Sequence, residues 1–317
     1  MGFIQHKIPS LYRRRTFSDK FSDTMDFITA NWRVLIRMLT IVLLPLCAIQ
    51  AINFNSFLNL YAVANSDSAN SDVIGLGLNY LSMIVFSMIV SGALVCVLFG
   101  IMKLYHSLDE DGNPAVSNLN SMTFSQFRPI LKEQVVPALK SIGAFLLLVI
   151  ALFIIFLAII FVIMANSVNS LLVGLLVAVL ILAATLLLFP AFMLVFPIYS
   201  FERIGFFDGI VKAVKYGIKT WRGVVAVTFV VGMLVSVVVG VLGLPWTILM
   251  VMKMIFVADN ENALAFTSTP WYSFVMYLSS IVYMFVSYVG YSVLFVALAY
   301  QYGHAHEVVD GADIDDF

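Results

Sequence analysis

Long apolar runs alternate with short polar segments along the whole chain. Six runs reach the ~20 residues that a helix needs to cross a hydrocarbon core about 30 Å thick, and none of the six contains Asp or Glu. The pattern predicts six transmembrane helices: Val34–Phe54, Leu78–Leu104, Ile142–Met164, Leu171–Tyr199, Gly223–Leu244 and Ser273–Tyr300. A seventh run, Trp246–Val257, is too short to span; it follows Gly243 and Pro245, which break helices, so we expect it to be re-entrant or interfacial on the outer side.

A segment with helical periodicity precedes each odd-numbered span. The apolar residues that recur at helical spacing are Phe17, Phe21, Met25 and Ile28 in the first segment, Phe124, Phe127, Leu131 and Val135 in the second, and Phe207, Val211, Val214 and Ile218 in the third. Thr123 and Gln126 have the spacing of a capping box. Charged residues occupy the other faces, and amphipathic helices of this kind can lie flat in the headgroup layer.

The segments and spans recur about every 100 residues, which indicates an internal repeat. Asn31-Trp32-Arg33-Val34 and Thr220-Trp221-Arg222-Gly223 lead into their spans in nearly the same way. We therefore predict one all-α integral membrane domain, residues 1–317, with six transmembrane helices as three repeats of an interfacial amphipathic helix plus a transmembrane hairpin. The predicted repeats cover 16–105, 123–199 and 206–302, and an acidic cytoplasmic tail follows at 303–317.

The composition agrees with a membrane protein, because 62% of the residues are hydrophobic and only 11% are charged. Placing both termini in the cytoplasm puts 16 of the 17 Lys and Arg residues on that side, as the positive-inside rule requires; the outer loops, near 55–77, 165–170 and 251–272, hold only Lys253. Trp32 and Trp221 fall at inner boundaries, and Trp246 and Trp271 at outer ones. Trp32, Arg33, Trp221 and Arg222 are therefore candidate interface residues.

The end of the fourth predicted span holds the sharpest polar motif. Pro190 can kink this helix, Pro197 follows it, and Glu202 and Arg203 come at the inner surface. Glu202 could pair with a basic residue of the next interfacial helix and fix the second repeat against the third. The alternative is that Glu202 faces water.

Other polar groups have both a functional and a structural interpretation. His304 and His306 suggest a metal site, but residues two apart in a helix point to different sides, so a solvated tail is favoured. The basic run 13–15 would bind anionic headgroups or hold the N-terminus inside. Cys47 and Cys96, both within apolar runs, are expected to be free thiols.

Small and hydroxylated residues mark three helix faces. Two stripes of small residues, which favour close helix packing within the chain over dimerisation, are Gly92, Cys96 and Gly100, and Gly232, Ser236 and Gly240. A hydroxyl face on the sixth span would line a polar path or bond to backbone carbonyls; it consists of Ser280, Tyr283, Ser287 and Tyr291.

The sequence contains no nucleotide-binding loop, zinc-protease motif or nucleophile elbow, and no charge at the centre of a span. We therefore expect no catalytic, metal or cofactor-binding site. The basic run near the N-terminus is short and has acidic neighbours, which argues against nucleic acid as a partner. The expected partners are the lipid bilayer and other inner-membrane proteins.

Two stretches carry a resemblance to a known family. They are Arg15-Thr-Phe-Ser-Asp through Phe27-Ile28-Thr-Ala-Asn31-Trp-Arg, and Phe196-Pro197 through Phe201-Glu202-Arg203 followed by Gly209-Ile-Val-Lys-Ala and Trp221. The chain resembles uncharacterised bacterial six-helix membrane proteins related to the membrane domain of some glycerophosphodiester phosphodiesterases, in the version with a short C-terminal tail seen in Bacteroidota. The resemblance implies six helices in a bacterial inner membrane and brings no catalytic residue.

The leading functional hypothesis is a non-enzymatic scaffold or partner subunit of an inner-membrane complex, which contacts partners or lipid headgroups through its cytoplasmic interfacial helices. The alternative is a transporter or permease component for a neutral or lipidic substrate, favoured by the kink at Pro190, the break at Gly243 and the hydroxyl face. A membrane-embedded enzyme would need polar groups gathered at one depth, such as Glu202, His106, His304 and His306.

Overall fold

The computed structural model describes residues 10–66, 73–107, 119–165, 171–259 and 269–311. Within these ranges the chain is helical and has no strand. Its elements are α1 (Phe17–Ser66), α2 (Val73–His106), the 3₁₀ helix η1 (Leu119–Ser121), α3 (Phe124–Ala165), α4 (Leu171–Phe201), α5 (Phe206–Lys219), α6 (Trp221–Leu242), α7 (Leu244–Asp259) and α9 (Pro270–Val309). Among them, α1, α2, α3, α6 and α9 are long and apolar enough to cross a membrane. The fold is thus that of an all-α, multi-pass membrane protein.

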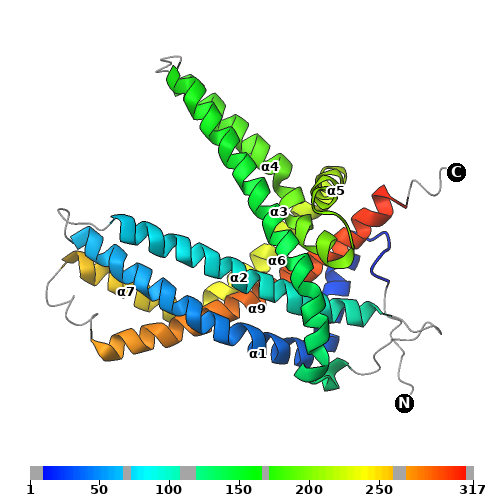
Figure 1. Cartoon of the computed structure of the whole chain (residues 1–317), viewed down its shortest axis with the longest axis horizontal. Helices are drawn as coiled ribbons and strands as arrows, with labels where there is room; N and C mark the ends of the chain where they lie inside the picture. The colour runs from blue at the N-terminus through cyan, green and yellow to red at the C-terminus, as the bar shows by residue number, and fades with distance from the viewer. Residues whose placement is uncertain (1–9, 67–72, 108–118, 166–170, 260–268, 312–317) are drawn as a thin grey trace.

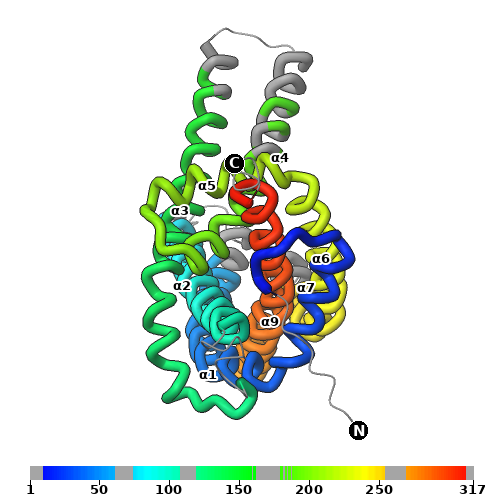
Figure 2. Tube along the Cα trace, turned by 90° about the vertical axis from the view of Figure 1, so that its right-hand side faces the viewer, coloured from blue at the N-terminus to red at the C-terminus, as the bar shows by residue number. Residues whose placement is uncertain are grey.

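The helices form a bundle and a diverging hairpin (Figure 1). Helices α1, α2, α6, α7 and α9 run side by side, whereas the hairpin of α3 and α4 meets the bundle at one end and then extends away from it, as Figure 2 also shows. The described ends of the chain lie together with α5 at the end where the hairpin meets the bundle. We call this region the terminal end.

Two clusters of buried apolar side chains lie near the terminal end and share α9. One joins α1, α2 and α9 around residues such as Met38, Phe99 and Tyr300. The other joins α4, α5 and α9 around Ile198 and Tyr216. Because lipid tails are as apolar as these side chains, close packing and hydrogen bonds, not escape from water, hold such helices together.

The described parts of 55–77 and 251–272, two segments predicted as outer loops, are mostly helical, and nearly all of 165–170 lies outside the described residues. Helix α1 continues to Ser66, so its 50 residues extend about 75 Å, well beyond the thickness of a hydrocarbon core. Helices α2, α7 and α9 also reach into the segments 55–77 and 251–272. The prediction failed because local polarity suggested loops, whereas a distant cluster stabilises helix there: Leu58 of α1 packs with Tyr272 and Met276 of α9.

The short run after Gly243 is helix α7, and it packs against α1 and α9. Trp246 stacks on Tyr283 with ring centroids 4.1 Å apart, and its indole N–H donates to the Ser280 hydroxyl at 3.1 Å. Lys253 donates to the side-chain oxygen of Asn59 in α1. Trp246 is thus held against α9 by ring stacking and a hydrogen bond.

The three amphipathic segments differ in how they join their spans. The first two run into α1 and α3 without a break, so they are not separate interfacial helices. Only the third, α5, is separate and ends at Thr220. Half of the predicted capping box is confirmed, because the backbone N–H of Thr123 donates to the side-chain oxygen of Gln126 at 2.9 Å; the Thr123 hydroxyl donates to the same oxygen at 3.0 Å.

The stripe on α2 packs within the chain, as predicted. A side chain at Gly92 would collide with Ile142 of α3, and one at Gly100 would press on Phe127. The stripe on α6 differs, because a Cβ atom at Gly232 or at Gly240 would meet nothing within 4 Å. That face of α6 is open in the described structure.

The hydroxyl face of the last helix is used for packing. Ser280 donates to the carbonyl of Met276 at 2.8 Å, and Ser287 donates to that of Tyr283 at 2.7 Å. The backbone-bonded alternative is therefore confirmed for these two serines. Cys47 and Cys96 are free and buried, as expected.

Candidate functional site at the terminal end

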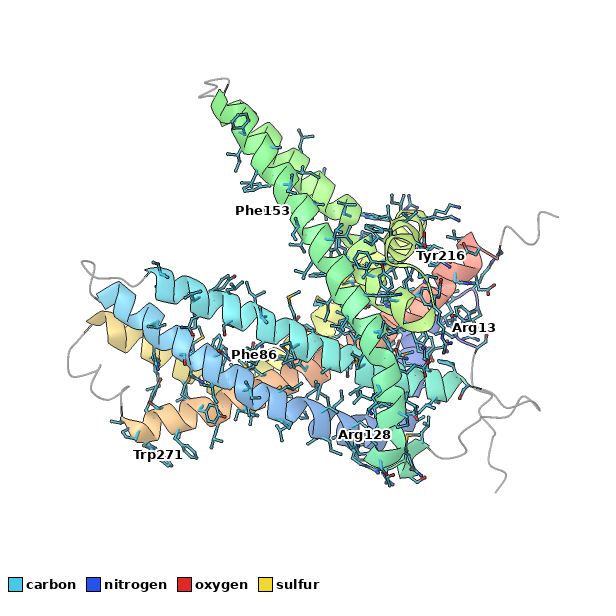
Figure 3. All side chains as sticks on the ribbon, viewed as in Figure 1. Arg13, Phe86, Arg128, Phe153, Tyr216 and Trp271 are labelled. Atoms are coloured by element: carbon cyan, nitrogen blue, oxygen red, sulfur yellow. The ribbon has the colours of Figure 1, made fainter. Side chains whose placement is uncertain are left out.

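The terminal end gathers the charged and aromatic residues that the spans lack. The last turns of α4, helix α5, the last turns of α9 and residues 10–16 meet there, and Figure 3 marks the place with Arg13 and Tyr216. We call their polar contacts the terminal junction.

Helix α5 is fixed to α4 by a face of small residues. Gly209, Ala213 and Gly217 are buried together with Tyr216. A Cβ atom at Gly217 would lie 2.8 Å from the backbone nitrogen of Ala191, so the two backbones touch at this point. Only glycine permits that approach, and it sets the position of everything else on α5.

The contact between α5 and α4 lies at the predicted kink. Proline has no N–H, so Pro190 leaves the carbonyl of Leu186, four residues earlier, without its helical donor. The indole N–H of Trp221 donates to that carbonyl at 3.0 Å. Pro190 and Trp221, two predicted interface residues far apart in sequence, therefore act at one place, whereas Pro197 lies buried about two turns closer to the end of α4.

Glu202, just after α4, accepts two hydrogen bonds. Lys212 of α5 donates to one carboxylate oxygen at 2.8 Å, and the hydroxyl of Tyr302 in α9 donates to the other at 2.5 Å. The predicted pairing of Glu202 with the next amphipathic helix is confirmed. The alternative, a water-facing Glu202, is wrong for a side chain that is half enclosed by α5 and α9.

Asp310 closes the same cluster from the C-terminal end of α9. Its carboxylate lies 3.2 Å from the ammonium group of Lys212 and 3.6 Å from that of Lys215, and it accepts a hydrogen bond from Tyr216. Burial opposes ionisation, but the Tyr216 and Lys212 contacts outweigh it and hold the pKa of Asp310 below its usual value. For Lys212, burial is likewise outweighed, by Glu202 and Asp310, and its pKa is raised.

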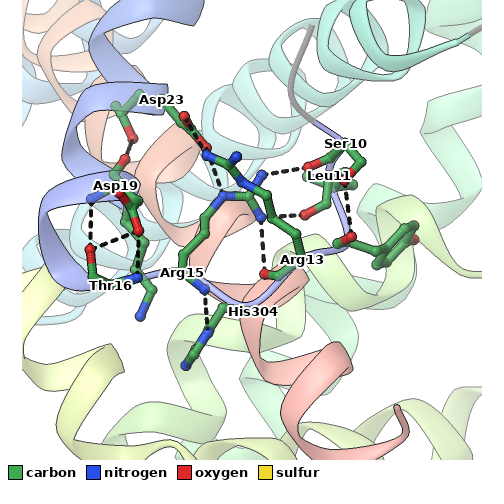
Figure 4. A network of polar contacts seen from close by, with 11 residues as sticks. Ser10, Leu11, Arg13, Arg15, Thr16, Asp19, Asp23 and His304 are labelled. Atoms are coloured by element: carbon green, nitrogen blue, oxygen red, sulfur yellow. Dashed lines mark hydrogen bonds and ion pairs between the residues drawn. The ribbon is translucent and has the colours of Figure 1, made fainter. Parts of the chain in front are cut away.

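A second network ties residues 10–16 to α1 and α9 (Figure 4). The Arg15 side chain has no exposed surface; it donates to Asp23 at 2.7 Å and to the carbonyls of Leu11 and Ser10. Burial lowers the pKa of Arg15, and the Asp23 carboxylate opposes that change. The backbone N–H of Arg15 donates to Nδ1 of His304 at 3.0 Å, which connects the beginning of the chain to its last helix.

The basic run at 13–15 is thus partly committed to internal contacts. Arg13 also pairs with Asp23, at 2.9 Å. Arg14 is exposed. Two of the three cations hold the N-terminal segment against the protein, a role that neither predicted interpretation contains.

The remaining predicted site residues lie outside the terminal junction. Trp32 is exposed, and the Arg33 guanidinium stacks over its ring with 5.5 Å to the centroid. Arg203 pairs with Glu133 at 3.2 Å, but both side chains are largely exposed, so the pair contributes little. Arg222 lies exposed at the first turn of α6.

The prediction of a solvated tail at 303–317 is wrong for its described part. Helix α9 continues to Val309, and His306 packs against the rings of Tyr12 and Tyr216. Among the described residues no three His, Cys, Asp or Glu side chains are placed to hold a metal ion. The only sequence signal for this packing was the aromatic content around Tyr300 and Tyr302.

The carboxylates and cations of the terminal junction neutralise one another in pairs. The arrangement therefore fixes α4, α5, α9 and the N-terminal segment as one unit. Comparisons of the chain with protein-family models, with curated proteins and with solved structures found no match.

Proposed function

We propose that the chain is a non-enzymatic scaffold or partner subunit of a bacterial inner membrane, which contacts lipid headgroups and partner proteins through the terminal end. In this proposal α4 also crosses the membrane and brings the number of spans to six, the three hairpins are repeats, and the terminal end with both termini faces the cytoplasm. The family resemblance and the inner excess of Lys and Arg support this orientation.

The outward face of α5 carries the proposal. Phe207 is 71% exposed, Val211 is 68% exposed and Ile218 is 50% exposed, although all three are apolar. They lie on one side of the helix, while the opposite side is fixed to α4 through Gly217 and its neighbours. A short helix with an apolar face turned outward and lysines beside it has the composition of an interfacial helix.

Spin labels on α5 in lipid nanodiscs test this placement. Cysteines would replace Val211 on the apolar face and the exposed Lys219 on the polar flank, in a chain whose Cys47 and Cys96 are alanine. We expect the label at 211 to be reached by oxygen dissolved in the lipid and the label at 219 by a water-soluble nickel complex. Equal access of the nickel complex to both positions would contradict the proposal.

A transporter or permease component is the second candidate, and the diverging hairpin favours it. Helices α3 and α4 extend away from the bundle, and they contain Pro137 and Pro190. Apolar residues along the hairpin, such as Phe153 and Phe161, are exposed. A hairpin that swings against a fixed bundle is one way to open and close a path for a substrate.

Distance measurements decide between the two candidates. Spin labels at Phe153 on the hairpin and Phe86 on the bundle, the positions marked in Figure 3, report the separation of the two parts. A scaffold predicts one narrow distribution of distances in nanodiscs. Two populations that exchange would favour the transporter.

A further inference from the structure

A pocket of about 460 Å³ opens at the terminal end between the start of α6 and the last turns of α9. Its wall includes Lys219, Thr220, Trp221, Arg222 and Gly223 on one side and His304 on the other. The volume is within the range of small-ligand sites. The junction described above does not use this space.

The first turn of α6 faces the pocket without a capping side chain. Thr220 precedes the helix, but its hydroxyl donates backward to the carbonyl of Tyr216 at 2.9 Å. The first N–H groups of a helix carry the positive end of the helix dipole. The N–H of Gly223 already donates to the carbonyl of Thr220 at 2.9 Å, so the N–H groups of Trp221 and Arg222 are the ones that face an anion. An anion at this place would receive those hydrogen bonds.

The charged side chains that line the pocket are all basic. Lys219 and Arg222 are exposed at its wall, and no carboxylate belongs to the lining. His304 accepts the Arg15 N–H through Nδ1, so in the neutral ring Nε2 carries the proton and can donate. The wall thus offers donors of three chemical kinds: backbone amides, cationic side chains and an imidazole.

A buried amide packs behind the pocket wall. Gln301 has no exposed surface, and neither its side-chain nitrogen nor its oxygen has a partner in the described structure. A Cβ atom at Gly223 would lie 2.9 Å from that nitrogen, so the amide lies against the glycine of the wall. Gln301 does not itself line the pocket, so the proposed anion contacts do not include it.

Lys20 adds a second unusual group. It is only 5% exposed and forms no ion pair within the described part of the chain. It lies close enough to His304 for their charges to interact. Lys20 does not line the pocket, so it would act on an anion there only through its positive charge.

We propose that this pocket binds a phosphate group, supplied either by the headgroup of an anionic phospholipid or by a soluble phosphate compound. Phosphate matches a helix N-terminus flanked by Arg and Lys. The apolar rim, which includes Trp221 and Val308, suits a lipid at the membrane boundary. If the phosphate belongs to a lipid headgroup, the pocket is part of the proposed lipid contact, and the inference rests on the proposed function. Binding of a soluble phosphate compound does not depend on that function.

Calorimetric titration of the full-length protein in neutral detergent tests the site with three probes: dihexanoyl phosphatidylglycerol, dihexanoyl phosphatidylcholine and inorganic phosphate. We expect binding of the anionic lipid, which Arg222→Gln weakens about tenfold, since a charge-assisted contact is lost. Lys219→Gln, on an exposed side chain, gives the same readout if Arg222→Gln does not fold. Arg203→Gln is the matched control, because its side chain is a 91% exposed cation at the same end but outside the pocket.

Each outcome decides one point. Binding of the anionic lipid and not of inorganic phosphate assigns the lipid source, and comparable binding of both assigns the phosphate group alone. No binding of either probe, or equal loss in the Arg222 and Arg203 variants, overturns the site. The position of α5 in nanodiscs is measured independently, so the absence of a phosphate site would not contradict the scaffold proposal.

Discussion

The indole nitrogen of Trp221 lies 3.0 Å from the carbonyl oxygen of Leu186 and supplies the hydrogen bond that Pro190 removes from α4. A proline in a membrane helix frees a carbonyl with no water nearby, so a neighbouring helix has to satisfy it. Here the donor comes from the residue that begins α6. Pro190 and the start of the next helix are therefore expected to be energetically coupled.

The coupling predicts a specific double-mutant cycle. Trp221→Phe removes the donor and should destabilise the protein by about 1 kcal/mol, the usual magnitude for such a bond. In a Pro190→Ala background the alanine N–H restores the helical bond, so the same change should cost less. Unfolding in mixed micelles by a denaturing detergent measures both values, and equal costs in the two backgrounds would refute the coupling.

Lys212 is expected to be the most sensitive residue of the terminal junction. Lys212→Met leaves the carboxylates of Glu202 and Asp310 without their shared cation and should cost about 2 kcal/mol. The matched control is Lys215→Met on the same helix, whose exposed side chain contacts Asp310 at 3.6 Å and should contribute below about 0.5 kcal/mol. Equal effects on detergent unfolding would show that the cluster is not coupled as described.

The same cluster predicts how stability depends on pH. The pKa of Asp310 is lowered in the folded protein, so its contribution is present above the unfolded value of about 3.9 and is lost as the pH falls below it. The pKa of Lys212 is raised, so its contribution is present below about 10.4 and is lost at higher pH. Asp310→Asn should flatten only the acid limb of a plot of unfolding midpoint against pH; an unchanged acid limb would exclude Asp310 as the cause.

Arg15 should control the order of the N-terminal segment. Arg15→Gln removes the ion pair with Asp23 and the bonds to two carbonyls, so residues 10–16 should exchange their amide hydrogens faster. Arg14→Gln, at an exposed neighbour, should leave exchange unchanged. Hydrogen exchange followed by mass spectrometry measures both variants, and protection that persists in Arg15→Gln would contradict the network.

Local pattern was enough to predict the helical class, the apolar row on α5 and the pairing of Glu202. The last of these depends on residues only ten positions apart, Glu202 and Lys212, so the periodicity of one short helix places them. Contacts between segments that are far apart in the sequence could not be predicted from local pattern. Tyr216 meets Asp310 across 94 positions, and nothing in a local pattern distinguishes a packed Asp310 from a solvated one.

The two similar helix starts illustrate the same limit. Asn31 and Thr220 both bond back to the carbonyl four residues earlier, yet α1 continues through Asn31 whereas α5 ends at Thr220. The difference is tertiary, because Gly217 rests on the backbone of α4 at Ala191 and directs α5 across it. The two similar Trp-Arg motifs alone do not indicate which helix continues and which one ends.

The bond between Arg15 and His304 also sets an order of assembly. Synthesis proceeds from the N-terminus, so the acceptor lies in the last described helix to leave the ribosome, 289 positions after its donor. The contact that joins residues 10–16 to the last described helix therefore forms only after α9 has been made, which makes it a late step of folding.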